Sequence, residues 1–121
     1  MNVLVVDGAN VMGSRPDGWW RDRPGAARRL AEALEAAQLP YDEVVLVLEG
    51  AARRGRPEGH GQGLRVEHAD ANGDDAIVDE VARQVPNGAK VEVVTADREL
   101  RSRVAVAGGT SLGPSWLLNQ L

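Results

Sequence analysis

Runs of aliphatic residues recur along the chain and predict its strands. Val3–Val6 and Val44–Leu48 are uninterrupted, and Val91–Thr95 is nearly as apolar. A half-exposed strand would alternate apolar with polar residues, so we expect these three strands to be buried on both faces. Leu64–His68 does alternate and predicts a short, half-exposed strand near the sheet edge, and Thr110–Leu112 is a candidate for a last short strand.

Helical periodicity fills the segments between these strands. Asp22 followed by Pro24 is typical of a helix start. Apolar residues then recur at a spacing of about 3.6, which predicts one face packed on the sheet. The apolar stripes comprise Ala27, Leu30, Ala31 and Leu34 in the first helix, Ile77, Val78, Val81 and Val85 in the second, and Leu100, Val104 and Ala107 in the third.

The alternation of strands and helices predicts an α/β fold with a parallel sheet and right-handed crossovers. A chain of 121 residues without repeats or low-complexity tracts indicates a single domain, 1–121. We expect two irregular stretches. Val11–Pro24 is rich in Gly, Pro and charge, and 51–63 reads as a flexible basic loop.

Acidic residues follow the predicted strands. Asp7, Glu49 and Asp97 each come directly or almost directly after an aliphatic run, and Asp74 and Asp75 lie in the first turn of a predicted helix. The carboxyl ends of parallel strands border the ligand crevice of such folds, so we expect these acids to converge. The alternative is that they only cap helices and complement helix dipoles.

Converging carboxylates favour a site for a hard divalent cation. They would repel one another and partly protonate unless a cation held them. Oxygen ligands suit Mg²⁺ or Mn²⁺. The chain has no Cys and two His, so thiolate sites are excluded and a zinc site has few ligands available.

Arginine and tryptophan provide the candidate contacts to nucleic acid. The net charge is -4, but all basic residues except Lys90 are Arg, which suits bidentate phosphate contacts. Arg53 and Arg54 would suit a phosphate backbone, although such runs are also common in solvated loops. Trp19 and Trp20 could stack bases. Alternatively, at least one of them anchors its loop on the sheet.

Three segments closely resemble the NYN family of PIN-like ribonucleases, in particular small single-domain members of actinobacterial type. The likeness extends over essentially the whole chain, and the loop with the paired Trp is its most specific part. The segments are Asp7-Gly8-Ala9-Asn10-Val11-Met12-Gly13-Ser14-Arg15-Pro16-Asp17-Gly18-Trp19-Trp20-Arg21-Asp22-Arg23, Gly73-Asp74-Asp75-Ala76-Ile77 and Val93-Val94-Thr95-Ala96-Asp97-Arg98-Glu99-Leu100.

The resemblance implies a PIN-like three-layer α/β/α sandwich with a mostly parallel central sheet, and metal-dependent hydrolysis of RNA, single-stranded or structured. Relatives usually carry Asp where this chain has Glu49, which leaves open whether Glu49 binds metal directly or through water. We therefore expect Asp7 and Asp97 to bind Mg²⁺ or Mn²⁺, Asp74 or Asp75 to orient metal-bound water, Asn10 and Thr95 to position the phosphate, and Arg15, Arg53, Arg54, Arg98, Trp19 and Trp20 to contact RNA.

Two other functions stay open at this stage. A noncatalytic RNA-binding or regulatory module could keep the fold without cleavage. A phosphatase using Asp7 as nucleophile is disfavoured, because such enzymes usually carry a second acid two residues later, where this chain has Ala9. The choice of RNA, activity on DNA and formation of a homodimer are also open. No apolar run approaches membrane-spanning length, so we expect a cytoplasmic protein without membrane contact.

Overall fold

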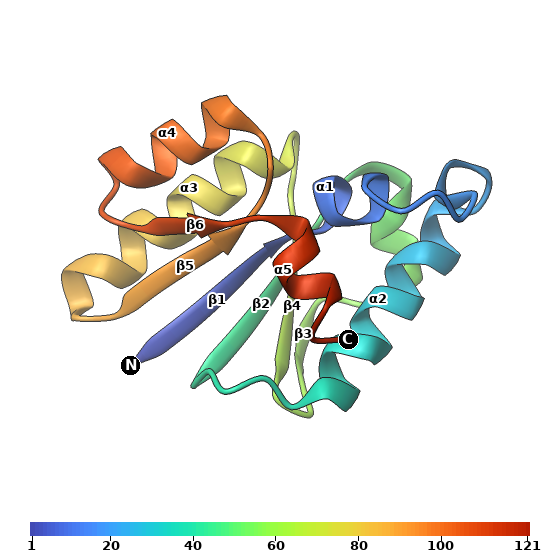
Figure 1. The fold of residues 1–121 in the computed structure, drawn as a ribbon, viewed down its shortest axis with the longest axis horizontal. Helices are drawn as coiled ribbons and strands as arrows, with labels where there is room; N and C mark the ends of the chain where they lie inside the picture. The colour runs from blue at the N-terminus through green and yellow to red at the C-terminus, as the bar shows by residue number, and fades with distance from the viewer.

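The computed structural model describes all residues, 1–121, and contains one six-stranded sheet (Figure 1). The strand order is β3-β4-β2-β1-β5-β6, and every neighbouring pair is parallel except β3 and β4. The predicted α/β class with a mostly parallel sheet is confirmed. The strands are β1 (Asn2–Asp7), β2 (Glu43–Leu48), β3 (Gly59–Gly61), β4 (Leu64–His68), β5 (Lys90–Val94) and β6 (Thr110–Leu112).

Helices cover both faces of the sheet and complete the three-layer sandwich (Figure 1). One face packs against α1, α2 and α5, and the opposite face packs against α3 and α4. Three short 3₁₀ segments join the elements. The α-helices are α1 (Gly8–Gly13), α2 (Arg23–Ala37), α3 (Gly73–Gln84), α4 (Arg98–Val106) and α5 (Pro114–Leu118), and the 3₁₀ segments are η1 (Trp19–Arg21), η2 (Gly50–Gly55) and η3 (Val85–Asn87).

The central strands are buried on both faces, as their aliphatic runs predict. In β1, Leu4 and Val6 belong to the apolar cluster with α2, whereas Val3 and Val5 belong to the cluster with α3 and α4. All four side chains are fully buried. β1 pairs in parallel with β2 and with β5, so the carboxyl ends of these three strands lie along one edge of the sheet.

The prediction of an irregular stretch after β1 is wrong in part, because α1 starts immediately at Gly8. The Asp7 side chain caps this helix by accepting the Asn10 N–H at 3.3 Å. A Cβ atom on Gly8 would lie 2.6 Å from the Val47 carbonyl oxygen, so only glycine allows α1 to start this close to β2. Within the same stretch, Trp19–Arg21 forms η1.

The second stretch predicted as a loop, 51–63, is also partly regular. η2 continues to Gly55, and Gly59–Gly61 adds the antiparallel edge strand β3. The hairpin between β3 and β4 turns at Gln62 and Gly63, with a positive φ of 78° at Gly63. Backbone hydrogen bonds to β4 define β3 as a strand. The Gly-His-Gly sequence of β3 has no apolar pattern that could predict it.

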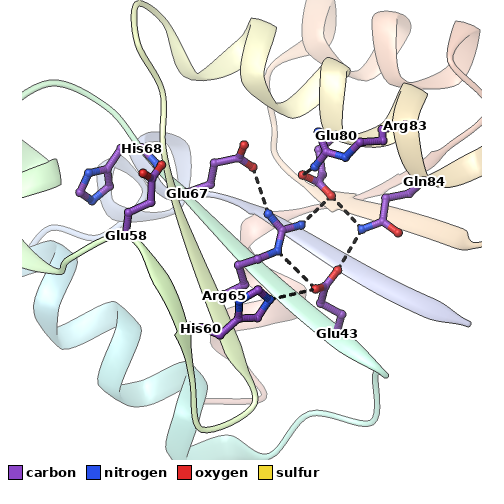
Figure 2. Close-up of polar contacts among 9 residues, drawn as sticks. All are labelled: Glu43, Glu58, His60, Arg65, Glu67, His68, Glu80, Arg83 and Gln84. Carbon is purple, nitrogen blue, oxygen red and sulfur yellow. Dashed lines mark hydrogen bonds and ion pairs between the residues drawn. The ribbon is translucent and has the colours of Figure 1, made fainter.

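A network of polar side chains joins β2, β4 and α3 on the face that α3 covers (Figure 2). Glu80 on α3 is fully buried and accepts hydrogen bonds from Arg65 at 2.6 Å, from Gln84 at 2.7 Å and from Arg83. Arg65 also contacts Glu43 at 3.3 Å. The buried carboxylate therefore has a positive or polar partner on each oxygen.

None of the helices combines the length and the apolar character that a membrane crossing requires.

Candidate active site

Four acidic side chains gather at the carboxyl edge of the sheet. Asp7 is the last residue of β1, Glu49 follows β2, and Asp97 lies three residues after the end of β5. Asp74 comes from the first turn of α3. Burial is the main cause that raises the pKa of Asp7 and of Asp74; the charges of Asp74 and Glu49 add to the shift of Asp7, and those of Asp97 and Glu49 add to the shift of Asp74.

Asp7 is the most buried member of this acidic cluster, with 6% of its surface exposed. Burial raises its pKa from 3.8 to about 6, and the neighbouring acids add to the shift, while hydrogen bonds from Thr95 and Asn10 oppose it. Part of the Asp7 population is therefore protonated in the metal-free protein near neutral pH.

Thr95 and Asn10 hold the β1 and β5 ends together around Asp7. The buried Thr95 hydroxyl donates to Asp7 Oδ2 at 2.9 Å and accepts the Asp97 N–H at 3.1 Å. The Asn10 side-chain oxygen accepts the Ala96 N–H at 2.9 Å. Thr95 is therefore placed to orient Asp7. From the sequence we expected its hydroxyl to position the phosphate, but the hydroxyl is buried.

The structure separates the neighbouring acids that the sequence left as alternatives. Asp74 is half-buried and belongs to the acidic cluster, where burial is the main cause of its raised pKa. Asp75 is exposed and accepts from Arg103 at 2.8 Å and, through its backbone N–H, donates to Asn72 at 3.0 Å. The Arg103 contact is the main reason that the pKa of Asp75 is lowered.

Asp97 and Glu49 both make local hydrogen bonds in addition to belonging to the cluster. Asp97 caps α4 by accepting the Leu100 N–H at 2.9 Å with Oδ1. Glu49 accepts the Gly73 N–H at 3.0 Å with Oε2. The capping function considered from the sequence is therefore real for Asp97, and one oxygen of each carboxylate has no hydrogen bond to the protein.

The donor chemistry of this cluster fits a hard divalent cation. No three acidic or histidine side chains converge tightly enough to enclose an ion without further ligands. Mg²⁺ is commonly held by one or two carboxylates together with waters and substrate phosphate. The clustered carboxylates, with the raised pKa values of Asp7 and Asp74, suit that open type of site.

A basic surface adjoins the acidic cluster. Arg53 and Arg54 are exposed on η2 and line a hollow of about 470 Å³ together with Gly50, Ala51 and His68. Arg56, the third arginine of this run, instead pairs with Glu35 on α2. Its guanidinium is therefore held away from a substrate by a tertiary contact, which leaves two of the three arginines free of side-chain ion pairs.

The other predicted RNA contacts lie at different depths. Arg98 is exposed at the start of α4, next to Asp97. Arg15 is half-buried and lines a narrow pocket beside Trp19. Trp20 is 52% exposed, whereas Trp19 packs against the α2 side of the core. Trp19 therefore anchors its loop on the core, one of the two roles considered for the pair, and base stacking by Trp20 stays a prediction.

A cavity of about 280 Å³ opens next to Glu49. Its walls are mainly apolar, formed by Met12, Trp19 and three alanines at positions 9, 51 and 52, and its charged lining residues are Arg23 and Glu49. The Arg23 guanidinium lies over the Trp19 ring, 5.5 Å from its centroid. Arg23 lies in the loop that carries the family resemblance, but its contact with the Trp19 ring joins η1 to the start of α2 and could not be predicted from the sequence.

Comparison with known proteins shows the fold. The crystal structure of the W164L mutant of Rae1 (YacP) from Bacillus subtilis matches with a TM-score of 0.72 and 17% sequence identity, covering 99% of this chain and 74% of that one. No protein-family model matches the sequence. No curated protein matches it either. This chain therefore shares its three-layer α/β/α fold with Rae1.

Proposed function

We propose that the protein is a metal-dependent ribonuclease, acting within the RNA chain, whose active site is the acidic cluster. The observation that carries this proposal is the convergence of Asp7, Asp74 and Asp97 without a cationic partner for Asp7, next to the exposed Arg53 and Arg54. The sequence resemblance to NYN ribonucleases at these same acids supports it.

One or two of the carboxylates of Asp7, Asp74 and Asp97 would hold Mg²⁺ or Mn²⁺ together with water and substrate phosphate, and Glu49 would contribute through water. The bound ion supplies polarisation of the phosphodiester and a lower pKa for an attacking water. Asp7 enters this site in a fixed orientation because Asn10 and Thr95 hydrogen-bond its two oxygens.

The other residues position the substrate. The exposed guanidinium groups of Arg53 and Arg54 would donate to backbone phosphates, and so would that of Arg98, which follows Asp97 at the start of α4. In the hydrolysis, a water oxygen would form a bond to phosphorus and the P–O bond to one ribose would break, which leaves a phosphate on one product and a hydroxyl on the other. A phosphatase mechanism through Asp7 stays disfavoured, because position 9 carries Ala where such enzymes usually carry a second acid.

A pair of adjacent substitutions tests the proposal. Asp74→Asn removes a charge from the acidic cluster, whereas Asp75→Asn removes the same charge from a residue turned to Arg103. We expect Asp74→Asn to lower cleavage of labelled single-stranded RNA in Mn²⁺ about 100-fold, or about 2.7 kcal/mol, and Asp75→Asn to change it less than threefold.

Two outcomes would contradict the proposal. Equal loss in both variants would mean that the cluster geometry does not define the site. RNA binding by the wild type without cleavage in either metal would instead favour the noncatalytic RNA-binding module.

A further inference from the structure

The cavity beside the acidic cluster has the size and surface of a site for one nucleobase. Its apolar walls include the Trp19 ring, and single-stranded RNA is commonly recognised by bases that leave the stack and contact aromatic side chains. Trp19 is held in place by packing on the core and by Arg23 over its ring. A base would therefore meet a surface that is already ordered.

The cavity is close to the proposed cleavage site. Ala9 in its wall is two residues from Asp7, and Glu49 in its lining is one of the charges that raise the pKa of Asp7 and Asp74. Gly50 and Ala51 line both this cavity and the hollow with Arg53 and Arg54. A nucleotide whose base enters the cavity thus has its phosphates between the acids and the arginines.

The two charged lining residues define which base edge would fit. Glu49 is an acceptor, and its Oε1 has no hydrogen bond to the protein. Arg23 is a donor. The Glu49 carboxylate also keeps its place through the Gly73 N–H, and a Cβ at position 73 would lie 3.3 Å from Oε1, so glycine there leaves the carboxylate room.

Guanine matches this pair of groups. Its N1–H and 2-amino group are adjacent donors for a carboxylate, and its O6 and N7 are acceptors for a guanidinium. Adenine and cytosine each place a ring-nitrogen acceptor beside their amino group, where it would face the negative charge of Glu49. Uracil offers one N–H between two carbonyl acceptors.

We propose that the cavity between Trp19, Arg23 and Glu49 is a guanine-binding subsite that selects where RNA is cut. The selection of the cleavage site rests on the proposed nuclease function, whereas the preference for guanine in binding does not depend on catalysis. Glu49 then serves as the base-reading residue, in addition to or instead of any contact to metal-bound water.

Binding of single nucleotides without metal tests the subsite directly. We would titrate the protein in EDTA with GMP, IMP, AMP, CMP and UMP and follow tryptophan fluorescence. We expect GMP to bind about 10- to 100-fold more tightly than AMP, CMP or UMP, and IMP, which lacks the 2-amino group, to fall between them. Equal affinity for all five nucleotides would overturn the inference.

Matched variants locate the preference. Glu49→Gln keeps the shape of the side chain and an acceptor for the Gly73 N–H, but its amide can both donate and accept, so we expect the ratio of GMP to AMP affinity to drop at least tenfold. Trp19→Phe should weaken the binding of all nucleotides, whereas Trp116→Phe, on α5 and outside the cavity, should weaken the binding of none. An unchanged ratio in Glu49→Gln would contradict the assignment of Glu49.

Cleavage products separate this inference from the proposed function. Cleavage of RNA in Mn²⁺ with no preference for sites next to guanine would overturn the subsite and leave the nuclease proposal intact. Selective GMP binding by a protein that cuts no RNA would overturn the nuclease proposal and leave the subsite intact.

Discussion

Two groups of carboxylates in this protein have opposite electrostatic surroundings. Glu80, on the face covered by α3, is fully buried, yet its pKa is lowered, because hydrogen bonds from Gln84 and Arg65 and the charge of Arg65 outweigh the effect of burial. Asp7, at the carboxyl edge of the sheet, is buried to a similar degree, and its pKa is raised to about 6.

The pKa values of Glu80 and Asp7 shift in opposite directions because their hydrogen-bond and charge partners differ, and not because one side chain is more deeply buried. Glu80 has two arginines and an amide on its oxygens (Figure 2). Asp7 has a hydroxyl and an amide N–H, and the nearby charges that shift its pKa are negative. A carboxylate whose positive partner is supplied by the protein stabilises the fold. A carboxylate that lacks one is suited to a partner from solution, such as a metal ion.

Removing Glu80 should have the largest effect on stability. Glu80→Ala removes the shortest ion pair of Arg65 and leaves it with Glu43 at 3.3 Å and Glu67 at 3.4 Å, so we expect a loss near the lower end of the range for breaking a buried ion pair, about 3 kcal/mol. Asp79→Ala, an exposed acid on the same helix, should change the free energy of unfolding by less than about 0.5 kcal/mol. Urea denaturation measures both. Similar small effects in the two variants would mean that the network contributes little.

Removing the charge of Asp7 should increase the free energy of unfolding, and the size of the increase should depend on pH. With a pKa of about 6 in the folded protein and 3.8 ordinarily, Asp7 makes the folded state bind more protons between these values. Its contribution to the free energy of unfolding therefore falls as pH rises through that range, by about 3 kcal/mol in total.

In EDTA at pH 8, Asp7→Asn should accordingly be more stable than the wild type by up to about 3 kcal/mol, less what the weakened Thr95 hydrogen bond costs. This gain should disappear near pH 4, where Asp7 is neutral in the folded wild type. Denaturation curves at the two pH values provide the test. An equal destabilisation at both would show that charge burial is not what distinguishes Asp7.

The arginines of the basic surface should have the smallest effect on stability and a measurable one on RNA binding. Replacing Arg53 and Arg54 by Ala removes two exposed cations that make no ion pair in the free protein. If each contacts a phosphate, the slope of log affinity against log salt should decrease by about 1.4 for single strands, with the same loss for all RNA sequences. Salt-dependent binding to unrelated oligonucleotides measures this, and an unchanged slope would exclude the contacts.

The sequence was sufficient to predict the strands, the longer helices and the edge where the acids gather. The aliphatic runs at β1 and β2 could only be buried on both faces, and parallel strands necessarily bring Asp7 and Glu49 to the same edge. The short strand β6 was predicted, but two other short elements, α1 and β3, were not. α1 depends on the close approach of Gly8 to Val47, and β3 depends on backbone pairing with β4.

The finer features of the site depended on tertiary contacts. Arg103 from another helix pairs with Asp75 and so distinguishes it from Asp74, and the pair with Glu35 removes Arg56 from the basic surface. Glu80 was also overlooked, although an acid three residues after Ile77 lies within the apolar stripe of its helix, which was a usable signal of a buried partner.

The most direct test of the central claim combines stability and cleavage in one variant. Asp97→Asn removes a charge from the acidic cluster but keeps a side chain that can cap α4. In EDTA the variant should melt at or above the wild-type temperature. Adding Mg²⁺ or Mn²⁺ at about 100 times its dissociation constant should stabilise the wild type by about 2.7 kcal/mol, or several degrees, and the variant by much less.

RNA cleavage measured on the same samples should require metal in the wild type and be strongly reduced in Asp97→Asn. A wild type whose melting temperature does not respond to either metal, and which cuts RNA equally well in EDTA, would contradict the account.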